Sequence, residues 1–198
     1  MRESPYALNV RRATPPSRVT LRPYRRGDGR FFRQALTEAQ DYYSDLDRHA
    51  HFLRARGYAA RYANRLLRRM RRQAGIVLVG QVGDQPAGLI AAEMIRRRSH
   101  YYPIGEALNP RRYRSAEVVE LYLREAYRRR GVGRALMAEA ERRFRLRGCD
   151  WVRLEVLAPN RVARALYAEL GYRATDLRLG QALRTSKSRK LNHVGRVR

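Results

Sequence analysis

Residues 116–144 read AEVVELYLREAYRRRGVGRALMAEAERRF and join three elements without a gap. Apolar residues dominate positions 118–123, which predicts a buried strand. A short basic turn with two glycines follows, RRRGVG at 128–133. An amphipathic helix is then indicated by apolar residues at three- and four-residue spacing: Val132, Ala135, Leu136, Ala140 and Phe144.

The turn between this strand and this helix favours the binding of an anion. The first backbone N–H groups of a helix have no partner within it, and the macrodipole adds about half a positive charge there. Gly131 and Gly133 leave the backbone open to a phosphate. The adjacent arginines add charge-assisted contacts. The sequence therefore predicts a di- or polyphosphate ligand at this turn.

Two common phosphate motifs are excluded by the residues present. A nucleoside-triphosphate loop needs Gly-Lys-Ser/Thr, and the only lysines are Lys187 and Lys190. A dinucleotide fingerprint needs Gly or Ala at position 136, which is Leu136. It also needs an acid at the far end of the next strand, whereas Asp150 stands at the start of that strand.

The pattern Arg128-x-x-Gly131-x-Gly133 after a strand resembles the acetyl-CoA signature of the GNAT superfamily of N-acetyltransferases. The second half of that family's pattern is also similar, NRVARALYAELGY at 160–172. The likeness is sharp over 117–173 and looser from Arg18 onward. It implies acetyl-CoA as co-substrate, with these contacts: Leu121, Tyr122, Leu123, Arg128, Arg129, Arg130, Gly131, Val132, Gly133, Arg134 and Asn160.

Two residues are candidates for proton transfer. The resemblance places Tyr167 where the family's general acid protonates the CoA sulfur, although the spacing of Tyr167 also suits packing on an apolar helix face. Glu120 interrupts an otherwise apolar strand, and such a carboxylate needs a partner or a task. We therefore predict Glu120 as the base, with Glu117 or a water relay as alternatives; an exposed sheet position for Glu120 is the competing interpretation.

The order strand, helix, helix, hairpin, strand, helix, strand, helix, strand predicts an α/β fold with a mixed sheet. The resemblance implies a GNAT-like sheet of six to seven strands with about four helices. In that fold two central parallel strands splay apart, here 118–123 and 151–157. We expect one domain over 18–183, its last strands between 172 and 183, a flexible leader at 1–17 and a basic, disordered tail at 184–198.

The net charge of +26 calls for an explanation. Residues 1–17 contribute +2 and residues 181–198 contribute +6, which leaves +18 on the residues between them. A coding bias toward arginine and an attraction to RNA, DNA or an acidic partner are both compatible with this charge. An arginine-rich helix face favours an acidic macromolecule: Arg61, Arg65, Arg68, Arg69 and Arg72. An acidic run instead favours a cationic amine: Glu38, Asp41, Asp45 and Asp47.

We expect a cytoplasmic protein. The sequence contains no apolar run of membrane-spanning length, no signal peptide, and Cys149 as its single cysteine. The histidines show no metal-ligand spacing, so no metal is expected.

The expected activity is direct transfer of the acetyl group of acetyl-CoA to a primary amine: a small cationic amine, an amino acid or a protein N-terminus. The alternative is a basic GNAT-fold protein that binds RNA or acts on a ribosome-associated substrate. The sequence leaves monomer and homodimer open.

Overall fold

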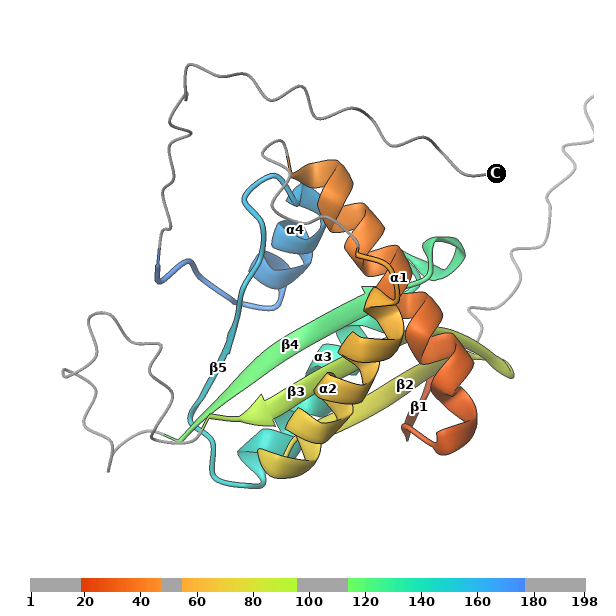
Figure 1. Ribbon diagram of the computed structural model, residues 1–198. Helices are drawn as coiled ribbons and strands as arrows, with labels where there is room; N and C mark the ends of the chain where they lie inside the picture. The colour runs from red at the N-terminus through yellow and green to blue at the C-terminus, as the bar shows by residue number, and fades with distance from the viewer. Residues whose placement is uncertain (1–18, 48–54, 96–113, 177–198) are drawn as a thin grey trace, which may run out of the picture.

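The computed structural model describes residues 19–47, 55–95 and 114–176, which form a five-stranded mixed sheet between two helical layers (Figure 1). The strands lie side by side in chain order, antiparallel except for the parallel pair β4 and β5. Their bounds are β1 Val19–Pro23, β2 Ile76–Val82, β3 Gln85–Met94, β4 Ser115–Leu123 and β5 Trp151–Leu154.

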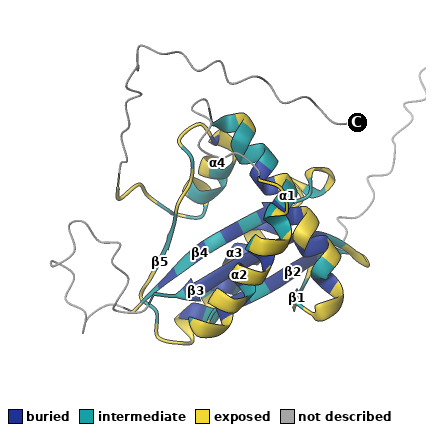
Figure 2. Cartoon of the chain, viewed as in Figure 1, coloured by how far each residue is buried: buried dark blue, intermediate teal, exposed yellow. Residues whose placement is uncertain are grey.

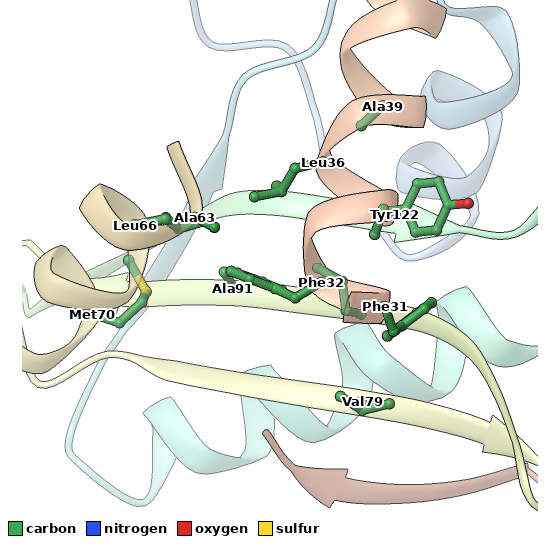
Figure 3. Close-up of a cluster of buried hydrophobic side chains, with 12 residues drawn as sticks. Phe31, Phe32, Leu36, Ala39, Ala63, Leu66, Met70, Val79, Ala91 and Tyr122 are labelled. Carbon is green, nitrogen blue, oxygen red and sulfur yellow. The ribbon is translucent and has the colours of Figure 1, made fainter. Parts of the chain in front are cut away.

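One face of the sheet is covered by α1 (Gly29–Leu46) and α2 (Tyr58–Arg72). Their apolar sides meet inward-facing strand residues in one core cluster (Figure 3): Phe31, Phe32, Leu36, Leu66, Met70, Val79, Ala91 and Tyr122 among others. The outward sides of both helices are polar and largely exposed (Figure 2). This separation into a buried and an exposed side is what the helical spacing of their apolar residues requires.

The opposite face is covered by α3 (Val132–Arg145), which packs Leu136, Met137 and Phe144 against the sheet in a second core cluster. The fourth helix, α4 (Arg161–Glu169), follows β5 and lies beside the C-terminal part of α1 (Figure 1). The short 3₁₀ turns are η1 (Arg26–Asp28) and η2 (Glu125–Tyr127).

A β-bulge in β4 reverses the alternation of its side chains. Ala92 pairs with Val118 and Ala91 pairs with Glu120, so Val119 is the extra residue. Val118 belongs to the α3-side cluster and Val119 packs against the α1/α2-side cluster. Strict alternation would then direct Glu120 into the apolar α3 side. Because of the bulge, Glu120 lies on the α1/α2 side instead.

The two parallel strands pair over only part of the length of β4. Their pairing ends at Val118 and Leu154, although β4 continues to Leu123. After β5 the chain leaves the sheet and runs up to α4 (Figure 1). One edge of residues 119–123 is therefore not paired with β5.

The prediction of six to seven strands was wrong: the described residues form five. The last strands were expected between 172 and 183, but 172–176 form no strand and 177–183 lie outside the described residues. The predicted strand at 151–157 ends early, at Leu154, because the chain there parts from β4 and loses its pairing partner. The proposed leader at 1–17 and tail at 184–198 also fall outside the described residues.

Candidate active site

Glu120 is a buried carboxylate with one satisfied and one free oxygen. Its side chain lies on β4 and the residue is 7% exposed. The Tyr62 hydroxyl on α2 donates a hydrogen bond of 2.6 Å to Oε1, while Oε2 is buried without a hydrogen-bond partner. Burial raises the pKa of Glu120 to about 7, and the bond from Tyr62 partly opposes that rise. Glu120 can therefore exchange a proton near neutral pH.

Four tyrosines surround this carboxylate. Tyr43 comes from α1, Tyr58 and Tyr62 from α2, and Tyr167 from α4. Burial, and after it the negative charge of Glu120, raises the pKa of each hydroxyl, to about 12 for Tyr58 and for Tyr167. Tyr58 stacks on Tyr62 with ring centroids 5.3 Å apart, which holds the donor ring in place. All four hydroxyls are neutral donors at physiological pH.

Tyr167 packs as its helical spacing predicts. Its ring packs against the α3-side core and lies 5.9 Å from the ring of Tyr172. The charge of Glu120 also raises the pKa of Tyr167, so the hydroxyl lies within electrostatic range of that carboxylate. Packing fixes the ring, and the hydroxyl forms no hydrogen bond within the described residues.

The start of α3 presents the expected free amides. The first bond of the helix runs from the Ala135 N–H to the Gly131 carbonyl. The N–H groups of 132–134 consequently have no acceptor within the helix. Gly131 is left-handed at φ +79°, and a Cβ placed there would meet nothing within 4 Å. The turn is thus open on the side of Gly131.

Gly133 serves close packing. A Cβ at Gly133 would lie 3.0 Å from Leu123 Cδ1 and 3.2 Å from Leu166 Cδ2. The absence of a side chain at this position therefore lets the end of β4, the start of α3 and the side of α4 approach one another.

The four arginines of the turn have different surroundings. Arg128 donates from Nε to the Leu123 carbonyl at 3.3 Å, and its guanidinium lies 5.5 Å from the Tyr42 ring. Arg130 lies over the ring of Tyr127, and Arg134 forms an ion pair of 2.7 Å with Glu169. Arg129 is left-handed at φ +61° and exposed, and its side chain has no partner among the described residues. Arg129 is therefore the most available of the four cations.

Asn160 is the N-cap of α4. Its Oδ1 accepts from the Ala163 N–H at 3.1 Å and from the Tyr42 hydroxyl at 3.2 Å. Asn160 thus satisfies a backbone N–H in the first turn of α4. Because Oδ1 already holds two donors, any contact with a coenzyme has to come from its amide nitrogen. The bond to Tyr42 also ties α1 to α4 at the rim of the site.

Glu117 is engaged elsewhere. It pairs with Arg69 at 3.2 Å and with Arg153 at 3.6 Å, and Arg69 also binds Glu93 at 2.6 Å. Both ion pairs hold the carboxylate of Glu117 in place, whereas Oε2 of Glu120 has no hydrogen-bond partner among the described residues. This arrangement favours Glu120 over Glu117 as the base.

The residues at this end of β4 fit the coenzyme that the resemblance implies. The open turn and free amides at the start of α3 suit a diphosphate. The edge of 119–123 that β5 leaves unpaired offers backbone groups to an extended arm, and the free oxygen of Glu120 lies on the same strand.

In the described residues no group of three or more metal-ligating side chains occurs. No helix of the described residues is long and apolar enough to cross a membrane.

Tyr62 and Tyr43 are the site residues that sequence reasoning missed. Tyr62 stands at a core position of α2 among Ala63 and Leu66, where its spacing indicates packing. Two signals were available: a buried tyrosine hydroxyl usually has a partner, and so does a buried carboxylate. The bulge that brings Tyr62 and Glu120 together has no such signal in the sequence.

Comparisons with known proteins bear on the family and the fold. The model of the acetyltransferase (GNAT) family matches residues 39–172. Among solved structures, a GCN5-related N-acetyltransferase from Ralstonia eutropha JMP134 is 22% identical, with a TM-score of 0.60, over 83% of this chain and 98% of that one. AAC(6')-Iy, solved with the bisubstrate analogue CoA-S-monomethyl-acetylneamine, is 14% identical, with a TM-score of 0.59, over 85% of this chain and 100% of that one.

A transcriptional regulator from Bacillus halodurans C-125 is 19% identical, with a TM-score of 0.60, over 84% of this chain and 100% of that one. These likenesses to solved structures concern the fold. No curated protein sequence matches the chain.

Proposed function

Since the chain belongs to the acetyltransferase (GNAT) family, we propose that it transfers the acetyl group of acetyl-CoA directly to a primary amine. The observation that carries this proposal is Glu120, a buried carboxylate with a pKa raised to about 7 and one free oxygen. It lies on β4, the strand that leads into the turn at the start of α3.

In the proposed reaction Glu120 takes a proton from the acceptor amine. Acetyl-CoA supplies the activated acyl group as a thioester. An amine attacks only in its neutral form, so a base must take a proton from it. Oε2 of Glu120 accepts that proton, while Tyr62 holds Oε1 and thereby orients the free oxygen.

Tyr167 supplies the proton that the departing sulfur needs. Burial is the largest cause of its raised pKa, and the charge of Glu120 is the second. When Glu120 takes the proton of the amine it becomes neutral, and this second cause disappears. The Tyr167 hydroxyl is then a better acid at the moment when the thiolate leaves, so the two groups work in sequence. The nitrogen, which still carries one proton too many after the attack, returns a proton to the Tyr167 oxygen, so that amide, free thiol and neutral Tyr167 result.

The coenzyme is held by the chain's own backbone and by one free cation. The amides of 132–134 bind its diphosphate beside the open Gly131, and Arg129 adds a charge. The backbone of 121–123 pairs with its extended arm. Arg128 and Arg134, already engaged with neighbours, shape the turn instead.

The acceptor lies beside the tyrosines that α1 and α2 contribute near Glu120. Aromatic rings around a buried carboxylate favour a cationic amine over a neutral nucleophile. A small cationic amine, an amino acid and a protein N-terminus all satisfy this requirement. The reaction belongs in the cytoplasm, where Cys149 stays reduced.

Titration calorimetry with a matched pair of variants tests the coenzyme site. The left-handed Gly131 tolerates Asn and Asp better than other side chains, and both would point into open space. Gly131→Asp adds a negative charge beside the bound phosphates, whereas Gly131→Asn adds the same shape without the charge. We expect acetyl-CoA to bind at least about tenfold more weakly to the Asp variant than to the Asn variant. Equal affinities would refute the site.

The acceptor is identified by measuring acetyl-CoA consumption across polyamines, aminoglycosides, amino acids, basic peptides and charged tRNA. An amine substrate should stimulate release of free CoA in the wild-type protein and not in Glu120→Gln. If no amine stimulated consumption, the proposed reaction would be wrong even where acetyl-CoA binds.

A further inference from the structure

The outer side of α2 carries a row of arginines that acetyl transfer does not use. We call this row the α2 stripe: Arg61, Arg65, Arg68 and Arg72. All four residues are exposed, and α2 lies on the outside of the molecule (Figure 2). Spacings of four, three and four residues place them along one side of the helix, over about 16 Å at 1.5 Å per residue.

The charges of the α2 stripe are not neutralised within the described residues. None of its arginines forms a salt bridge there, and Arg65 contacts only the ring of Tyr62, at 5.3 Å. The neighbouring Arg69 shows the contrast, because it turns inward to Glu93 and Glu117. Only two of the 18 acids of the chain, Glu3 and Glu106, lie outside the described residues.

This arrangement works against the stability of the isolated helix. α2 contains six arginines and no acid among its 15 residues. Like charges at four-residue spacing destabilise a helix by about 0.2–0.5 kcal/mol per pair. Cations in the last turn favour the macrodipole, but Arg61 lies near the start of the helix and Arg65 at its middle, where the macrodipole does not stabilise them. A coding preference for arginine over lysine does not account for the absence of acids.

The chemistry of the surface favours a phosphate backbone over an acidic protein. Protein interfaces need an apolar centre, and the other exposed residues of α2 are Ala60, Asn64 and further arginines. A nucleic acid needs only an extended row of cations, and guanidinium matches phosphate in a bidentate manner. The charge of +18 over residues 18–180 extends the attraction beyond the helix.

We propose that the α2 stripe is a binding surface for the phosphodiester backbone of a nucleic acid. Tyr58 and Tyr62 of the acceptor site belong to the same helix, so a bound strand would run past the entrance of that site. The α2 stripe and the proposed acetyl-transfer site share no residues, so either proposal can fail without the other.

Fluorescence anisotropy of the full chain with labelled 20-nucleotide single strands of RNA and DNA, and with a duplex, tests the proposal across a salt series. The stripe variant carries Gln at 61, 65, 68 and 72. The matched control removes four other exposed arginines that form no salt bridge with described residues: Arg26, Arg30, Arg145 and Arg173. Both variants lose the same charge, and acetyl-CoA binding reports that each remains folded.

Each lost phosphate contact lowers the slope of log K against log salt by about 0.7 for a single strand. We expect the slope of the stripe variant to fall by about 3, and that of the control by less than about 1. Two double variants, at 61 and 65 and at 68 and 72, should each lose about half of the full effect. They keep the test intact if the quadruple variant does not fold.

Equal slopes for the stripe variant and the control would show that binding follows net charge alone and would overturn the proposal. Competition by polyglutamate as effective as by RNA would overturn it in favour of an acidic protein partner. The probe that binds with the highest affinity, among the RNA strand, the DNA strand and the duplex, identifies the kind of nucleic acid that the stripe binds.

Discussion

Glu120→Gln should abolish acetyl transfer and at the same time change how stability depends on pH. The carboxyl has an ordinary pKa of 4.5 and a folded value of about 7. The folded state therefore holds this proton more tightly than the unfolded state. The contribution of Glu120 to stability is fully present below pH 4.5 and is lost as pH rises through the folded pKa of about 7. At about 1.4 kcal/mol per pKa unit, this difference corresponds to about 3 kcal/mol.

Glutamine cannot lose a proton, so its contribution does not vary over this range. Its amide oxygen can accept from Tyr62, and its NH₂ group takes the position of the unpartnered Oε2, at a constant desolvation penalty of about 1–3 kcal/mol. The informative quantity is consequently the change with pH of the variant-minus-wild-type difference in unfolding free energy. We expect this difference to increase by about 3 kcal/mol between pH 4.5 and pH 8.

Urea titrations at half-unit pH steps, followed by circular dichroism, measure the difference directly. Glu125→Gln removes an exposed carboxylate and controls for the loss of one negative charge. A variant-minus-wild-type difference that stayed constant from pH 4.5 to pH 8 would refute the buried, pKa-raised state of Glu120. The assignment of Glu120 as the base would lose its physical support with it.

Three further predictions concern the same site. Tyr167→Phe should lower kcat by about 10²-fold, the range of general acid catalysis, with acetyl-CoA affinity unchanged by calorimetry; an unchanged kcat would remove its role. Tyr62→Phe should shift the acid limb of the kcat/KM profile to higher pH, because the hydrogen bond from Tyr62 lowers the pKa of Glu120 and its loss raises that pKa; a shift to lower pH would contradict this. Deletion of Val119 preserves the pairing of Glu120 with Ala91 but removes the bulge, so sheet content should persist while acetyl-CoA binding weakens; unchanged affinity would show that the bulge is dispensable.

The parts of the fold that depend on local patterns were predictable from the sequence. The strand, turn and helix of 116–144 lie where their apolar spacing placed them. The left-handed Gly131 and the capping Asn160 follow from the same local rules.

The contacts within the site depend on features that no local pattern specifies. The single-residue bulge at Val119 decides which side of the sheet receives Glu120. The apolar pattern of the sequence is compatible with a strand that has the bulge and with one that lacks it. The early end of β5 depends on a partner strand that the sequence of β5 does not contain. The tyrosines near Glu120 come from three helices, and their meeting is a tertiary event.

Glu120 is where stability and function conflict most clearly in this molecule. A core position of β4 occupied by an apolar residue would avoid the penalty of burying a charge at neutral pH. The structure instead places a carboxylate there and provides it with one donor, Tyr62. A second donor on Oε2 would lower the pKa of Glu120 and make it a weaker base. The lack of a partner for Oε2 among the described residues therefore keeps the pKa of Glu120 near neutrality, and the bulge directs the carboxylate to the α1/α2 side, where we propose that the amine binds.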